Sequence, residues 1–248
     1  MKNILFAIAF LFSVVSFGQA LTAKQIIKKV DSKMKGTSNT FAEMKITTVR
    51  PKWTRSKMLK TWSDGKDGMI LVTEPVKEKG IVFLKKDKEV WNWVPNINRM
   101  IKMPPSMMMQ SWMGTDLKND DLVRQSSIVD DYKHTLLKDT VINGKDCYQI
   151  EMIPHENAVV VWGKMVTCVD KVHFVQMNTK LYDEELDLIS TMKASQITNY
   201  QGRYLAKRTE IIPVKKNAQM TVMEYQKLDF DITIPENFFT VQNMKKVQ

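Results

Sequence analysis

Apolar and polar residues alternate along most of the chain from residue 41 onward, and a period of two is typical of β-strands with one buried face. The pattern is interrupted after residue 94, resumes with a run at residues 132–141 and continues to residue 230. After that run, Asn143-Gly144 predicts a tight hairpin into residues 146–153. The first short runs, each bounded by turn residues, lie at residues 41–49, 57–63, 69–73, 80–85 and 89–94. We therefore expect successive antiparallel strands.

Two segments carry helix signals instead. Thr22 is placed as an N-cap, with Gln25 completing a capping box and Gly36 ending the helix. Its apolar stripe is formed by Ile26, Ile27, Val30 and Met34. Later in the chain, Pro104 and Pro105 suit a helix start and Gly114 its end, which predicts a second helix over residues 105–113.

A further helical turn is expected to begin at Asp116. Together these elements predict a mainly β (α+β) fold with about ten or eleven strands and two or three helices. We expect one large, curved, partly closed antiparallel sheet with the helices over one opening. Since the sequence has no Pro/Gly/Ser-rich linker and no internal repeat, residues 21–248 are expected to form a single domain.

Methionine and tryptophan are concentrated in one short stretch of the chain, which begins in the expected strand at residues 89–94 and runs through the second expected helix. Six of the 18 methionines and three of the six tryptophans fall between Trp91 and Met113. Because methionine repacks around irregular apolar partners, this concentration favours a binding surface for a greasy ligand, with the second helix as a flap over a cavity. Ordinary core packing of the same residues is the alternative.

The N-terminus indicates export. Lys2 precedes an apolar run, and Gly18 and Ala20 stand where a signal peptidase cleaves, so residues 1–20 are predicted to be a cleaved signal peptide. We therefore expect the protein to be periplasmic. Because no cysteine stands at the cleavage site, we do not expect the protein itself to be lipidated. The formal net charge of +10 then points to anionic lipid head groups or acidic envelope polymers as contacts, and not to nucleic acid.

Export also changes what the two cysteines predict. A hairpin centred near residue 157 or 158 would set Cys147 opposite Cys168, and the alternatives are a cross-strand disulfide or two buried thiols. Neither cysteine has a neighbouring base or a redox spacing, so neither is expected to be catalytic.

Enzyme function is not indicated by any motif. His134, His155 and His173 lack the spacing of a metal-binding helix, and no nucleophile elbow, phosphate loop or dinucleotide fingerprint is present. The adjacent acids Asp120-Asp121 and Glu184-Glu185 are typical of solvated or helix-capping carboxylates. We expect no catalytic residue, no metal site and no cofactor.

Six segments of the chain resemble a known family. They are WSDGKD at 62–67, GIVFLK at 80–85, WNWVP at 91–95, PSMMMQSWMGTD at 105–116 with DDL at 120–122, NGKDCY at 143–148 and PENFFT at 235–240. Together they are similar to the outer-membrane lipoprotein-sorting proteins, which are LolA-like periplasmic carriers, and specifically to a divergent branch found beside envelope transporters. The similarity extends over essentially the whole chain after residue 20.

This resemblance implies a half-open β-barrel closed by helices, with an apolar cavity for acyl chains of lipoproteins or other lipids and no catalysis. An inner-membrane transporter and an outer-membrane acceptor would be the partners of a monomeric carrier. The residues expected to bind lipid are Trp91, Trp93, Met100, Met103, Met107, Met108, Met109, Trp112 and Met113. Arg99, just before the flap, is expected to hold it shut or to meet a lipid head group.

A non-catalytic envelope sensor or adaptor of the same fold, acting with a membrane transporter, is the alternative function. In the carrier hypothesis, replacing Met108, Met109 and Trp112 together with serine should abolish acyl-chain binding and leave the fold intact. Collapse of the fold would instead assign these residues to the core.

Overall fold

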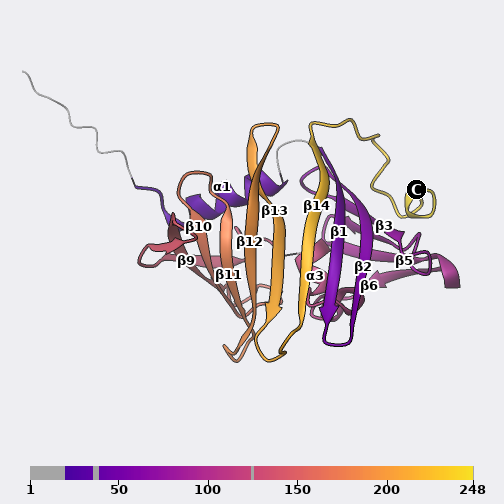
Figure 1. The fold of residues 1–248 in the computed structure, drawn as a ribbon. Helices are drawn as coiled ribbons and strands as arrows, with labels where there is room; N and C mark the ends of the chain where they lie inside the picture. The colour runs from indigo at the N-terminus through magenta and orange to yellow at the C-terminus, as the bar shows by residue number, and fades with distance from the viewer. Residues whose placement is uncertain (1–19, 36–38, 124–125, 248) are drawn as a thin grey trace, which may run out of the picture.

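The strands of the protein form one continuous antiparallel sheet (Figure 1). The computed structural model describes residues 20–35, 39–123 and 126–247. The fourteen strands within these residues are β1 (Thr40–Arg50), β2 (Trp53–Ser63), β3 (Gly68–Glu74), β4 (Val82–Lys86), β5 (Glu89–Val94), β6 (Arg99–Met103), β7 (Tyr132–Leu136), β8 (Thr140–Ile142), β9 (Lys145–Pro154), β10 (Lys164–Asp170), β11 (Gln176–Tyr182), β12 (Leu188–Tyr200), β13 (Arg203–Pro213) and β14 (Met220–Phe230).

Their order in the sheet is β6-β5-β4-β3-β2-β1-β14-β13-β12-β11-β10-β9-β7, with β8 paired to β9. Within the described residues the two end strands, β6 and β7, do not pair with each other, so the sheet is curved but not closed. This confirms the predicted mainly β fold with a half-open curved sheet. The predicted signal peptide, apart from Ala20, and the predicted helix end at Gly36 lie outside the described residues.

The strand count is higher than the ten or eleven predicted. Strand β6 was not predicted, and residues 132–141 form two strands instead of one. The break between β7 and β8 comes after Leu137, whose backbone N–H still donates to the carbonyl of Gln149 at 2.8 Å. Both short strands pair with β9, and Asn143 and Gly144 turn the chain between β8 and β9 with positive φ of 50° and 75°, as a tight hairpin requires.

The first helix begins as its sequence predicts. The backbone N–H of Thr22 donates to Gln25 Oε1 at 2.8 Å, and the N–H of Gln25 donates to Thr22 Oγ1 at 3.3 Å, which is a reciprocal capping box at the start of α1 (Ala23–Lys35). Its apolar residues Ile26, Ile27 and Val30 are buried in the main core. Helix α1 therefore covers the concave face, in contact with β7 and β13.

The chain between β6 and β7 connects the two edges of the sheet. It contains α2 (Pro105–Met108), a 3₁₀ turn at Trp112–Gly114 and α3 (Asn119–Val123). The helix predicted over 105–113 is wrong beyond residue 108. The reason is that the chain folds back, with the N–H of Trp112 donating to the carbonyl of Leu117 at 2.8 Å and Met113 in a left-handed conformation at φ 46°.

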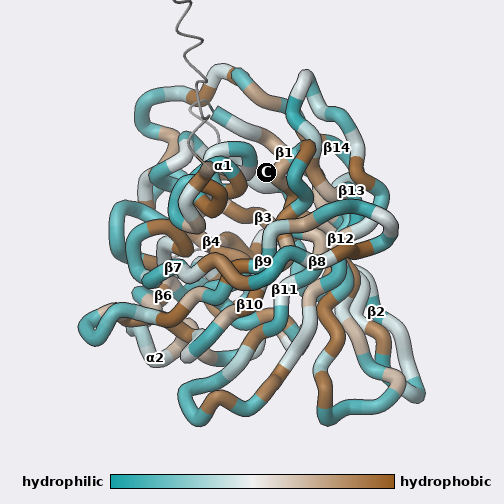
Figure 2. The backbone as a smooth tube through the Cα atoms, turned by 90° about the vertical axis from the view of Figure 1, so that its left-hand side faces the viewer, coloured by the Kyte–Doolittle hydropathy of each residue, from teal (hydrophilic) through white to brown (hydrophobic). Residues whose placement is uncertain are grey.

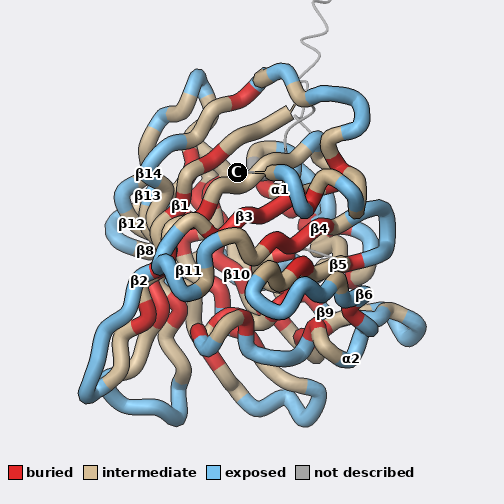
Figure 3. The backbone as a smooth tube through the Cα atoms, turned by 90° about the vertical axis from the view of Figure 1, so that its right-hand side faces the viewer, coloured by how far each residue is buried: buried red, intermediate tan, exposed pale blue. Residues whose placement is uncertain are grey.

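Apolar side chains are buried on both faces of the sheet. The main core lies on the concave side, beneath α1 and the connecting segment. The strands around it, β3, β4 and β10 among them, carry apolar and buried residues (Figures 2 and 3). A second cluster lies on the outer face of β3, β4 and β5, covered by the C-terminal residues 231–247 with Phe239 and Met244 buried. Both cavities described next lie on the concave side.

Candidate functional site

The larger cavity lies between α1 and the concave face of the sheet. It has a volume of about 240 Å³ and is lined mostly by apolar side chains of β1, of β10 to β14 and of the α3–β7 segment. Among them are Met44, Met165, Leu181, Met192, Leu205 and Met223. The alternation along each strand places these residues on one face, so the curved sheet forms an apolar pocket under the helix.

A smaller cavity of about 150 Å³ continues along the same face toward β1, β2 and β3. It is more polar, because the hydroxyls of Thr40, Thr61 and Ser63 and the turn at residues 65–68 contribute to its wall. The two cavities share four lining residues, which are Met44, Asp121, Met223 and Tyr225. They are therefore adjacent compartments of one concave groove.

Asp121 lies where the two compartments meet. Trp162 Nε1 donates to its Oδ1 at 2.9 Å, and the backbone N–H of Lys118 donates to its Oδ2 at 2.7 Å. Burial, together with the nearby charge of Asp120, raises the pKa of this carboxyl to about 6, against the effect of the two hydrogen bonds. The neighbouring Asp120 accepts hydrogen bonds from the backbone N–H of Ser126, at 3.0 Å, and from its hydroxyl.

The raised pKa of Asp121 predicts a specific pH dependence of stability. Between pH 4 and pH 6 the native protein holds a proton that the unfolded chain, with an ordinary pKa of 3.8, has released, so the free energy of unfolding should fall as pH rises through this range. The loss should be on the order of 3 kcal/mol. In urea unfolding at a series of pH values, Asp121→Asn should remove this component, whereas the exposed control Glu185→Gln should retain it.

None of the predicted lipid-binding residues is among those that line the two cavities. Met103, Met108 and Trp112 are buried in the main core, with Met107 and Met113 packed against it, and Met109 is 47% exposed. The indole of Trp112 lies 5.9 Å from the ring of Phe83. Their role as lipid ligands stays a prediction, and the walls of the two cavities are formed by other residues.

The remaining three belong to the outer cluster. Trp93 is buried there, with Trp91 and Met100 packed against the same cluster, and the C-terminal segment covers them. The ammonium of Lys245 lies 4.9 Å from the ring of Trp93. Because Trp91 and Trp93 share one face of β5, and that face is the outer one, neither lines the concave groove.

Arg50 holds the Met-rich segment, and the role predicted for Arg99, to hold this segment or to meet a lipid head group, stays a prediction. The guanidinium of Arg50 donates to both carboxylate oxygens of Asp116, at 2.8 and 3.1 Å, and to the carbonyl of Gly114 at 3.2 Å. Thr221 adds a hydroxyl donor to Asp116 at 2.8 Å. Arg99 is exposed on β6. Arg50 is a strand-end residue whose partner lies 66 positions away, so no local pattern indicated it.

The two cysteines are free, buried thiols, which is the second of the two alternatives that the sequence left open. In the hairpin of β9 and β10, Cys168 lies opposite Gln149 and Cys147 lies opposite Asp170. The pair is therefore offset by two residues and not directly opposite. Burial raises the pKa of both thiols, as expected for inert core cysteines.

Other kinds of site are not indicated by the described residues. Among residues 20–35, 39–123 and 126–247, no group of three His, Cys, Asp or Glu side chains is arranged to hold a metal ion. The helices in this part of the chain are all too short or too polar to cross a membrane.

Comparison with solved structures identifies the fold. An outer-membrane lipoprotein-sorting protein domain from Vibrio parahaemolyticus superposes with a TM-score of 0.81 at 20% identity, covering 90% of this chain and 98% of that one. A LolA superfamily protein from Nitrosomonas europaea gives 0.78 at 22% identity, with 90% and 99% covered. A DUF1329 family protein from Desulfovibrio piger gives 0.78 at 20% identity, with 90% and 98% covered.

Comparison by sequence gives a family match of wide extent. No curated protein matches the chain. A family model, described as that of an uncharacterized protein, matches residues 64–246. The chain therefore belongs to the family that this model describes, and it resembles the outer-membrane lipoprotein-sorting proteins of the LolA superfamily, whose fold it has.

Proposed function

We propose that the protein is a non-catalytic carrier that holds the acyl chain of a lipoprotein or another lipid in the cavity beneath α1. The observation that carries this proposal is the larger cavity, because its wall is mainly apolar and it lies on the concave face of an open sheet. A solved structure with this fold, from Vibrio parahaemolyticus, is described as that of an outer-membrane lipoprotein-sorting protein domain. We extend a lipoprotein or lipid cargo to this chain because the apolar wall of the cavity suits an acyl chain.

Transfer of an acyl chain through water needs such a cavity. Each methylene moved out of water contributes about 0.8 kcal/mol, so an uncovered chain would not leave a membrane at a useful rate. Methionines on the wall, including Met44, Met165 and Met192, adapt to chains of different shape. An adaptable wall permits both binding and release.

The proposed setting is the periplasm, which the sequence indicates through residues 1–20. An inner-membrane transporter would supply the cargo and an outer-membrane acceptor would receive it. Mass spectrometry of protein purified gently from a periplasm tests this directly. A stoichiometric lipid or lipopeptide in the native-state mass is the expected result. An apoprotein that forms a stable complex with a membrane protein and binds no fluorescent fatty acid would instead support the adaptor function.

Filling part of the larger cavity should weaken binding strongly. Ala194 is buried on β12 and lines this cavity, so Ala194→Phe places a ring where the acyl chain would lie. Displacing about three methylenes should weaken the binding of a fluorescent fatty acid roughly 50-fold. Asn199→Phe, at an exposed position on the same strand, is the matched control and should bind as the wild type does. If both variants bound the fatty acid equally well, the ligand would have to bind outside this cavity.

A further inference from the structure

The hydrogen-bonded ladder between β13 and β14 stops partway along the two strands. Pairing joins residues 208–211 of β13 to residues 221–224 of β14. Among the described residues it does not continue between residues 203–207 and residues 225–230, although both strands extend that far. Figure 1 shows β13 and β14 close together at their lower ends and apart above them. We call this unpaired stretch of the two strands the β13–β14 window.

Both flanking ladders are distorted where the window begins. On β14, Gln226 has no partner on β1, because the register shifts between Glu43 and Met44. On β12, Gln196 has a positive φ of 53°, a conformation that residues other than glycine rarely adopt. Bulges of this kind bend a strand and increase its twist. The window is therefore built into the backbone on both sides and is not a simple end of two strands.

Specific contacts frame the window at both ends. At one end the guanidinium of Arg208 donates to Glu224 Oε1 at 2.9 Å. At the other, the backbone N–H of Phe230 donates to Gln201 Oε1 at 2.8 Å. At about 3.3 Å per residue, residues 203–207 span roughly 16 Å. The frame fixes an opening of the length of a short strand.

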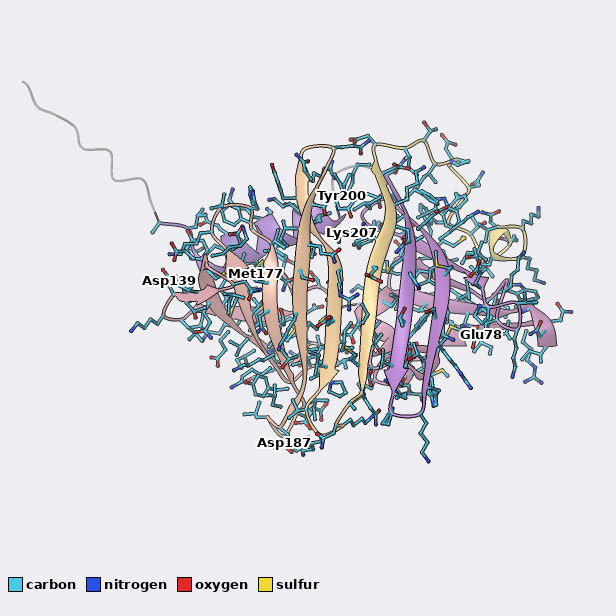
Figure 4. All side chains as sticks on the ribbon, viewed as in Figure 1. Glu78, Asp139, Met177, Asp187, Tyr200 and Lys207 are labelled. Carbon is cyan, nitrogen blue, oxygen red and sulfur yellow. The ribbon has the colours of Figure 1, made fainter. Side chains whose placement is uncertain are left out.

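The window opens onto the larger cavity. Leu205, Ala206 and Lys207 on one side and Glu224 and Tyr225 on the other all line that cavity. Lys207 alternates with Leu205 along β13 and so lies on the concave face, yet it is exposed. Figure 4 shows Lys207 beside the opening, below Tyr200.

Lys207 is an ammonium beside an apolar cavity with no partner for its charge. It makes no hydrogen bond or ion pair to any residue in the described part of the chain. Four carboxylates line the cavity: Glu224 is paired with Arg208, Asp31 belongs to α1, and Asp120 and Asp121 belong to α3. An anion at the window would meet Lys207, whereas an anion deep in the cavity would meet two acidic side chains.

Resting on the proposed carrier function, we propose that the β13–β14 window is the entrance to the larger cavity and that Lys207 binds the anionic head group of an acylated ligand. The chain of the ligand lies inside against the methionines, and its carboxylate or phosphate stays at the window. An ammonium donates hydrogen bonds readily to either group.

The head-group assignment is tested with palmitate, hexadecyl phosphate and the uncharged hexadecanol as competitors of a fluorescent probe. The wild type should bind the two anions more tightly than the alcohol. Lys207→Gln should weaken binding of the anions about tenfold and leave the alcohol unchanged. Lys193→Gln, an exposed lysine on the neighbouring strand β12 that lines neither cavity, is the control.

The three ligands also separate the possible outcomes. A loss for the phosphate alone, or for the carboxylate alone, names the source of the anion. Equal affinities of Lys207→Gln and wild type for all three ligands would overturn the assignment while the carrier function stands. Failure of the wild type to bind any of the three would overturn the carrier function itself, and the assignment with it.

The position of the entrance is tested by attaching a bulky group at the window that would block the passage of a ligand. Lys207→Cys labelled with a bulky maleimide should lower the association rate of the fluorescent fatty acid at least about tenfold in stopped-flow measurements, and Lys193→Cys with the same label should not. The native Cys147 and Cys168 are buried, and unlabelled wild type treated with the maleimide reports any reaction there. Equal rates for the two labelled variants would place the entrance elsewhere.

Discussion

Replacing Trp112 with alanine should lower the free energy of unfolding by about 4 kcal/mol. The indole is 0% exposed in the main core and lies against the ring of Phe83. Its Nε1 has no hydrogen-bond partner among the described residues, so the loss comes from apolar contacts and from the cavity left behind. Urea unfolding followed by circular dichroism measures the change, with an unaltered dependence on urea concentration confirming that the two end states are the same.

Met109→Ala provides the matched control within the same segment. Because Met109 is 47% exposed, its truncation should change the free energy of unfolding by less than about 0.5 kcal/mol. We therefore expect the triple serine variant at Met108, Met109 and Trp112 to lose its fold, contrary to the expectation from sequence. A Trp112→Ala variant that is as stable as the wild type but no longer binds fatty acids would instead support a role for Trp112 as a lipid ligand.

Replacing Arg50 with alanine should cost about 3 kcal/mol. The change leaves the side chain of Asp116, which is 4% exposed, without its bidentate partner, and Thr221 alone cannot compensate for a buried charge. Since Arg50 also donates to the carbonyl of Gly114, we expect the connecting segment to loosen first. Amide hydrogen exchange at residues 110–119 should rise before global unfolding, which distinguishes loss of this tie from uniform destabilisation.

Two variants isolate the contribution of this ion pair. Lys215→Ala removes an exposed pair with Asp187, whose side chains are 73% and 62% exposed, and should change stability very little. The double variant Arg50→Met, Asp116→Leu removes both charges and should recover much of the loss. If Arg50→Ala were as mild as Lys215→Ala, the pair would not hold the connecting segment.

Local structure was largely predictable from the sequence. The capping box of Thr22 and Gln25 and the hairpin turn at Asn143-Gly144 both depend on neighbours a few residues away, and both form as predicted. The alternating pattern likewise predicted most strands, because each strand buries one face whatever its neighbours are. The helix over 105–113 failed where the chain folds back through contacts that the local pattern does not contain.

The candidate site was not predictable in the same way. Alternation shows that Trp91 and Trp93 share a face, but the sign of the curvature decides whether that face is concave, and curvature is a property of the whole sheet. The C-terminal segment, more than 130 residues later in the chain, covers these tryptophans instead. Likewise, Arg50 holds the Met-rich segment across a separation of 66 positions, whereas the local sequence suggested Arg99, which lies just before that segment.

The sequence by itself determined the mainly antiparallel fold, the family resemblance and the capped first helix, because each follows from short-range patterns of polarity and turn residues. Only the tertiary structure decided which side chains line the cavities, which arginine holds the connecting segment and where the sheet opens between β13 and β14. Those features depend on contacts between distant strands and on two local distortions, near Gln226 and at Gln196, whose effect appears only when the strands are assembled side by side.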